Sequence, residues 1–185
     1  MKRLGSKSSV LLPYLLIVAA AVLRLTVSHP YNFIPIFSCL LFFGAVRPWR
    51  EFPMAFLGLV GVDMFLTTHR YGYLVTADHA VTWICYVAVL LLGAGLLRNT
   101  LSVPRAAGAS LGASISFFIA SNFAVWAVWG MYPKTWSGLG ACYVAALPFF
   151  RNSIVSETAC TLVIFGLVRY SEAFIPAMRA RRACI

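Results

Sequence analysis

Two carboxylates lie inside otherwise apolar stretches of this chain, and they are the side chains best suited to specific chemistry. Asp63 interrupts the stretch 53–68, and Glu157 lies early in the stretch 152–175. Charge in hydrocarbon is costly, so such residues usually face a cavity or a partner and mark a binding site or an ion path. Ion pairing with Arg24 or Arg151 is the structural alternative for both carboxylates.

Further polar and aromatic residues fall at a similar predicted depth, within roughly 10–12 Å of one membrane surface. Each has a simpler explanation, because an Arg can extend to the interface and an Asn can cap a helix or bond a neighbouring one. Their shared depth nevertheless predicts a polar pocket that opens toward one face, with the segment 68–78 as a covering loop. The residues expected to bind a substrate there are Asn32, Asp63, Asn122, Trp126, Tyr132, Lys134, Arg151, Asn152 and Glu157.

The sequence carries no HExxH, Walker A or GxGxxG signature, which are common marks of catalytic or cofactor sites. Its five cysteines form no CxxC or CxxH pair, so no zinc or redox motif is present. His69, Asp78 and His79 could form a metal site, but a solvated loop is the simpler interpretation. We therefore expect a protein that is not an enzyme and that holds no cofactor or metal.

The composition is typical of a membrane protein. Hydrophobic residues make up 61% of the chain and charged residues 11%, against about 45–50% and about 25% in soluble domains. The mean hydropathy is +0.85. A net charge of +10 could suggest nucleic-acid binding. Lys and Arg in short loops, however, set topology and meet anionic lipid head groups, so the expected partner is the lipid bilayer and not nucleic acid.

Hydropathy predicts an all-α integral membrane bundle of six transmembrane helices, in one domain that covers residues 1–185. A helix needs about 20 apolar residues to cross the hydrocarbon. The segment 130–151 is apolar but interrupted by Gly and Pro, so we expect it to be re-entrant or interfacial. Gly108 and Gly112, with Ala109, Ala113 and Ser116, form a face of small residues, and we expect it to pack inside the bundle rather than against a partner subunit. The expected spans are 10–27, 31–46, 53–68, 79–97, 106–129 and 152–175.

The distribution of basic residues predicts the orientation of the bundle. With six spans, one side carries all of the 15 Lys and Arg residues except Arg24, Arg70, Lys134 and Arg151. The positive-inside rule makes that side cytoplasmic. Both termini are then cytoplasmic, and the predicted pocket opens to the outside.

Several stretches of the sequence carry a family resemblance. They are Asn32-Phe33-Ile34-Pro35, Phe43-Gly44-Ala45, Ser121-Asn122-Phe123-Ala124-Val125-Trp126, Tyr132-Pro133-Lys134-Thr135, Gly138-Leu139 and 141–152. Over most of its length, and most strongly over 110–157, the chain resembles an uncharacterised family of small bacterial membrane proteins. The resemblance implies a multi-pass protein of the bacterial cytoplasmic (inner) membrane.

The layout of that family is similar to the S components of energy-coupling factor (ECF) transporters, which are membrane-embedded substrate-binding subunits for vitamins and metal ions. The similarity implies uptake of a small vitamin-like or polar molecule that binds near the outer surface. It also implies an ECF-type energising module as a candidate partner. Some solitary S-component-like proteins take up cobalamin with a thiolate ligand to cobalt, and Cys85 would be the candidate here, because a soft thiolate suits such a metal.

Three hypotheses follow from these observations. The leading one is a substrate-binding membrane protein whose outer loops close over a small molecule. The second is an accessory subunit of a larger membrane complex, in which the polar residues serve as internal ion pairs. The third is a membrane enzyme that acts on lipid head groups, for which the sequence offers no recognisable set of catalytic residues.

Overall fold

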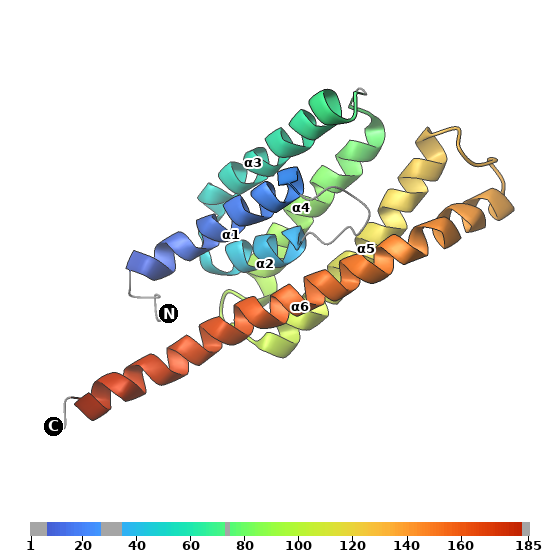
Figure 1. Cartoon of the computed structure of the whole chain (residues 1–185). Helices are drawn as coiled ribbons and strands as arrows, with labels where there is room; N and C mark the ends of the chain where they lie inside the picture. The colour runs from blue at the N-terminus through green and yellow to red at the C-terminus, as the bar shows by residue number, and fades with distance from the viewer. Residues whose placement is uncertain (1–6, 27–34, 73–74, 183–185) are drawn as a thin grey trace.

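The computed structural model describes residues 7–26, 35–72 and 75–182, and this part of the chain consists of helices and the turns between them, with no strand (Figure 1). The all-α prediction is therefore confirmed. A 3₁₀ turn, η1 (Trp49–Glu51), precedes the third helix, and a π-helical segment, η2 (Leu66–Arg70), continues it. The six α-helices of the described residues are α1 (Lys7–Thr26), α2 (Ile36–Val46), α3 (Phe52–Phe65), α4 (Ala77–Leu96), α5 (Val103–Val128) and α6 (Trp136–Arg182).

Four of the described helical segments are long and apolar enough to cross a membrane: Trp49–Arg70, Asp78–Leu96, Val103–Val128 and Trp136–Ser171. The apolar parts of α1 and α2 are shorter. With 11 residues, α2 is about 16 Å long, roughly half the hydrocarbon thickness. The expected span 31–46 is thus too short to cross where it is described, and residues 31–34 lie outside the described part.

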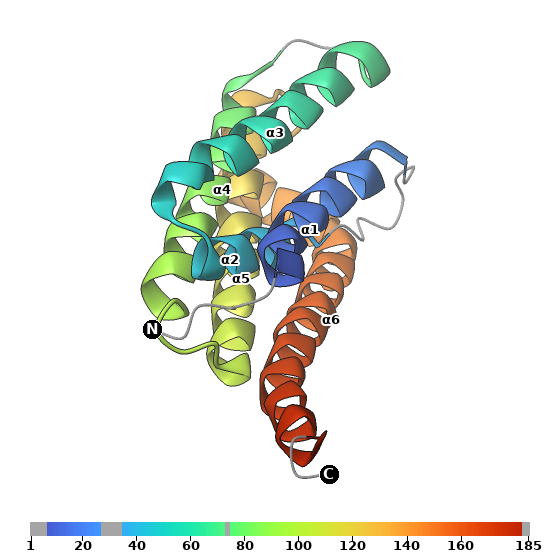
Figure 2. The same ribbon diagram turned by 90° about the vertical axis from the view of Figure 1, so that its left-hand side faces the viewer.

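The sixth helix differs most from the sequence prediction. It is a single helix of 47 residues, so 136–151 is not a separate re-entrant segment but forms the first turns of α6. Neither Pro148 nor Pro176 ends the helix, because a proline removes only one backbone hydrogen bond and is tolerated in membrane helices. At about 70 Å, α6 is far longer than the bilayer is thick, and its C-terminal end projects beyond the other helices (Figures 1 and 2).

The short helix α2 lies in the middle of the bundle, in contact with α1, α4, α5 and α6 (Figure 1). Every residue from Ile36 to Ala45 is buried, as expected for a helix that is apolar on all sides. Perpendicular ring contacts surround it: Phe42 packs on Phe165 with ring centroids 5.5 Å apart, and Phe43 packs on Tyr14 at 5.4 Å.

Two glycines let α2 and α4 approach closely. A methyl group added at Gly44 would overlap the carbonyl oxygen of Leu90, and one added at Gly93 would overlap that of Leu41. Small residues are the usual means by which membrane helices come into backbone contact. The fold thus relies on a glycine contact that differs from the one expected from sequence.

The face of small residues on α5 packs inside the bundle only in part. Gly108 and Gly112 are exposed, and nothing lies within 4 Å of the position that a methyl group on either would occupy. Ser116 is exposed as well, whereas Ala109 and Ala113 are buried. Internal packing of α5 therefore uses the alanines of this face and not its glycines.

The close contact of α2 with α4 predicts opposite results for two neighbouring glycines. Gly93→Ala should lower the melting temperature of the purified protein, because overpacking typically costs about 1–3 kcal/mol. Gly95→Ala, on the same helix but facing open space, should leave it unchanged or raise it, because Ala favours helix over Gly. Intrinsic fluorescence during heating in detergent measures both variants, and equal losses would contradict the described contact.

Candidate functional site

A carboxylate on α6 satisfies the buried N-terminus of α2. The Oε1 atom of Glu157 accepts the backbone N–H of Phe37 at 2.9 Å, and Oε2 accepts that of Ser38 at 2.7 Å. The Ser38 hydroxyl lies 2.5 Å from Oε2 and itself accepts the hydroxyl of Thr161 at 2.9 Å. These amides lack partners within a helix, and a negative charge is favoured at this end of the helix dipole. Glu157 is thus a buried cap that joins α6 to α2.

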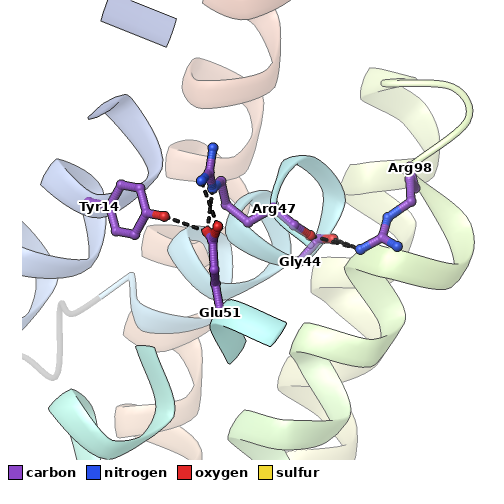
Figure 3. A network of polar contacts seen from close by, with 5 residues as sticks. All are labelled: Tyr14, Gly44, Arg47, Glu51 and Arg98. Carbon is purple, nitrogen blue, oxygen red and sulfur yellow. Dashed lines mark hydrogen bonds and ion pairs between the residues drawn. The ribbon is translucent and has the colours of Figure 1, made fainter. Parts of the chain in front are cut away.

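A cation satisfies the other end of α2 (Figure 3). Arg98 Nη2 donates to the carbonyl of Arg47 at 2.8 Å and lies 3.5 Å from that of Gly44. Arg47 itself forms a two-point ion pair with Glu51 at 2.6 and 2.8 Å, and the Tyr14 hydroxyl donates to the same carboxylate. Its hydrogen bonds to Glu51 raise the pKa of Arg47 above its ordinary value. This network fixes the end of α2 to α1 and α4.

A second buried carboxylate pairs with α1. Arg24 Nε lies 2.7 Å from Oδ1 of Asp63, whose side chain is 3% exposed. The two atoms are close without an aligned hydrogen bond, so neither carboxylate oxygen has a hydrogen-bond partner among the described residues. The Tyr86 hydroxyl lies within hydrogen-bonding reach of Asp63 and also interacts with the charge of Arg24, but its contact with Asp63 is likewise not aligned. Buried polar groups with unused bonding capacity are rare in folded proteins.

Two neighbouring cavities lie beside these groups. The first, which we name the aromatic cavity, has a volume of about 330 Å³ and begins at Ile36 and Phe37, where α2 starts. The second, which we name the loop-side cavity, has a volume of about 410 Å³. Both are lined by Arg24 and Thr82, so they adjoin. The aromatic cavity is further lined by Tyr86, Ser114, Phe117, Phe118, Ser121, Asn122, Ala146, Phe149, Phe150, Ser153 and Glu157, and the loop-side cavity by Asp63, Leu66, Thr67, Tyr71, Asp78 and His79.

The π-helical segment η2 shapes the loop-side cavity. Its wider turn is closed by a bond of 3.0 Å from the Tyr71 N–H to the Leu66 carbonyl, and such turns occur frequently at functional sites. The Thr67 hydroxyl donates to the carbonyl of Asp63 at 2.8 Å and lies 3.0 Å from Nε2 of His79. The expected covering loop 68–78 is therefore helical up to Arg70, and residues 73–74 lie outside the described part.

The structure brings three of the predicted site residues to the cavities. Asp63 lines the loop-side cavity, while Asn122 and Glu157 line the aromatic cavity. The structural alternative for Asp63, pairing with Arg24, is also present. Glu157 lies roughly 30 Å along α6 from Trp136, because the helix begins well before residue 152. Asn32 lies outside the described residues.

The other predicted residues do not line either cavity. Trp126 donates its ring N–H to the carbonyl of Pro133 at 2.9 Å, and Lys134 donates to the carbonyl of Trp129 at 3.1 Å and sits over the Trp126 ring. These contacts close the turn between α5 and α6. Of the other residues expected to bind substrate, Tyr132 is half-buried in that turn. On α6, Arg151 is exposed and Asn152 is half-buried.

The candidate cobalt ligand lies elsewhere as well. Cys85 is half-buried on α4 and packs against the apolar core. It lines neither cavity. Within the described residues, no group of three or more His, Cys, Asp or Glu side chains is placed to hold a metal ion.

Sequence reasoning missed the cavity lining on α4 and all of that on α5 except Asn122. Thr82 and Tyr86 are four residues apart, and Ser114, Phe118 and Asn122 follow one another at the same interval. Residues four apart lie on one face of a helix, so polar and aromatic side chains at this spacing were the available signal. Considered singly within apolar spans, they resemble ordinary packing residues.

One catalytic spacing is present on α5. The pentapeptide 108–112 reads GASLG and so matches GxSxG, whose serine belongs at a sharp strand-to-helix turn. Here it lies within a continuous helix, and the buried Ser110 hydroxyl has no hydrogen-bond partner among the described residues. The context needed for a nucleophilic serine is missing at this position.

A comparison with known protein families identifies a match to the chain. A family model described as a family of unknown function (DUF6580) matches residues 5–178. The chain belongs to this family. Neither the curated proteins nor the solved structures include one that matches it. Membership in DUF6580 confirms the expected resemblance to an uncharacterised family.

The cap formed by Glu157 can be tested in this DUF6580 protein. Glu157→Gln loses the charge and one acceptor at the N-terminus of α2, and hydrogen bonds to charged groups contribute about 1.5–3 kcal/mol. We expect a clear fall in melting temperature, and a larger fall for Glu157→Ala. Arg151→Gln, six residues earlier on the same helix but exposed, is the matched control and should melt like the wild type. A Glu157→Gln protein that melts with the wild type would contradict the cap.

Proposed function

We propose that this DUF6580 protein is a substrate-binding integral membrane subunit, similar to an ECF S component, for uptake of a small vitamin-like or polar molecule. The observation that carries the proposal is the pair of adjoining cavities next to buried polar groups whose hydrogen-bonding capacity is unused. Their volumes, about 330 and 410 Å³, fall in the range of ligand sites, about 300–1,000 Å³. A few polar groups in a mainly apolar hollow are typical of such sites.

The position of the cavities supports uptake rather than storage or scaffolding. They lie near the end of α1 and the start of α4, at the end of the bundle that the basic residues predict to be external. Toward the predicted cytoplasmic end, the space is filled by the buried helix α2 and closed by the Arg98 and Arg47 network. Substrate would enter from outside, and its release inside would require α2 to move against its neighbours.

The membrane setting of the proposal follows the same orientation. The protein would lie in the bacterial cytoplasmic membrane with both termini inside, and it would act by binding rather than by catalysis. An exposed apolar stripe on α1, formed by Leu11, Leu15, Val18 and Val22, suits either lipid or an ECF-type energising module. A module docked there could supply the energy to move the bundle around the bound substrate.

An accessory role in a larger membrane complex is the second candidate. It is favoured by the contacts of Glu157, because a carboxylate that caps α2 needs no ligand to explain it. The Arg24–Asp63 ion pair also fits an accessory role. That role does not account for the unused hydrogen-bonding capacity of Asp63, Tyr86 and Ser114 beside the cavities.

A cavity-blocking variant separates the two candidates. Ala146→Phe should fill part of the aromatic cavity, while Val144→Phe, on the same helix and 66% exposed, should not. Wild type and Val144→Phe, purified gently from native membranes, are expected to retain a small molecule that mass spectrometry detects, and Ala146→Phe is expected to have lost it. Identical small-molecule spectra from all three proteins would favour the accessory role.

A further inference from the structure

Carboxylates outnumber cations around the two cavities. Among the described lining residues, Asp63, Asp78 and Glu157 are acidic, and Arg24 is the one Lys or Arg. His79 lies beside one of these carboxylates, with its Nδ1 3.7 Å from Oδ1 of Asp78. Counting the Asp, Glu and Arg residues alone, the formal charge of the lining is negative.

The buried carboxylate of Asp63, a residue that lines the loop-side cavity, has an acceptor atom without an aligned hydrogen bond. Its Oδ1 is close to Arg24, but Oδ2 is buried and has no hydrogen-bond partner in the described part of the chain. A carboxylate accepts and cannot donate when ionised. What this site lacks is therefore a hydrogen-bond donor, and the excess of acidic groups favours a donor that carries positive charge.

The adjoining aromatic cavity suits the apolar body of the same ligand. Its walls include Phe37, Phe117 and the stacked rings of Phe118 and Phe150, whose centroids are 4.3 Å apart. The faces of aromatic rings attract cations, and rings combined with acidic groups form the usual recognition sites for organic cations. A carboxylate ligand would instead meet the acidic groups and find only Arg24, which is already paired with Asp63.

We propose that the substrate is an organic amine: a protonated nitrogen donates to Oδ2 of Asp63 in the loop-side cavity, and an apolar or aromatic body occupies the aromatic cavity. This inference rests on the proposed binding function and specifies the chemistry of its ligand. Because the acceptor needs an N–H group, primary or secondary amines fit better than a quaternary ammonium ion.

Three probes with the same ring and different head groups test the inference. They are 2-phenylethylammonium, 2-phenylethanol and 3-phenylpropanoate, added near neutral pH to the full-length protein in nanodiscs of zwitterionic lipid. The melting temperature of the wild type should rise with the ammonium probe at concentrations about tenfold lower than with the alcohol, and it should not rise with the carboxylate. The Ala146→Phe variant should respond to none of them.

Two variants test the assigned contact. Replacing both Arg24→Gln and Asp63→Asn removes the ion pair without leaving one charge buried, and it should bring the ammonium and alcohol responses within about twofold. Should that protein not fold, Asp78→Asn, whose side chain is 21% exposed, should reduce the preference for the ammonium probe. An unchanged preference in the variant that folds would overturn the assignment.

The outcomes distinguish failure of the amine inference from failure of the proposed binding function. Equal or stronger stabilisation by the alcohol or the carboxylate, lost in Ala146→Phe, would overturn the amine inference and leave the binding function standing. If no probe stabilises the wild type more than Ala146→Phe, both are overturned. A trimethylammonium analogue that binds as well as the primary amine would overturn the N–H contact to Asp63.

Discussion

A helix buried from Ile36 to Ala45 has backbone groups at its N-terminus that neither water nor lipid can satisfy, and the bundle is arranged around this requirement for α2. An unsatisfied N–H or C=O in the membrane interior costs several kcal/mol. Glu157 reaches from α6 to the first amides of α2, and Arg98 reaches from the end of α4 to its last carbonyls. Each charge also has the sign that the helix dipole favours. These two contacts set where α2 lies, and the glycine contacts with α4 set how closely it packs.

The length of α2 explains where the cavities are. A helix of 11 residues fills about half the thickness of the bilayer interior, and the aromatic cavity begins at its first two residues. Glu157 therefore has two neighbours, the helix end that it caps and the cavity that it lines. A molecule in the aromatic cavity would contact the N-terminal end of α2. Displacement of α2 would in turn open a path toward the predicted cytoplasmic side. Binding and movement of α2 are linked through this contact in the proposed uptake mechanism.

Hydropathy and charge predicted most of the helices but not their full lengths. The segments expected at 79–97 and 106–129 agree with α4 and α5 to within a few residues, because each is a clear apolar run with polar ends. The start of α6 was misplaced because Gly and Pro between 130 and 151 resemble breaks, whereas one long helix accommodates them. The prediction that 31–46 crosses the membrane was wrong for a different reason, because a buried core helix and a lipid-facing helix have the same apolar composition.

Of the site, the carboxylates and Asn122 were predictable from the cost of polar groups in lipid. The shape of the cavity depends on how α4, α5 and α6 pack, which a single sequence does not specify.

The most direct measurement is an electron cryomicroscopy structure of the full chain, purified from its native membrane in lipid and resolved to side chains. The account predicts the Glu157 carboxylate against the Phe37 and Ser38 amides, with non-protein density in the cavities between Asp63, Tyr86 and Asn122. A structure in which α2 is capped by other groups, or in which side chains close that space and leave no room for a molecule, would contradict it.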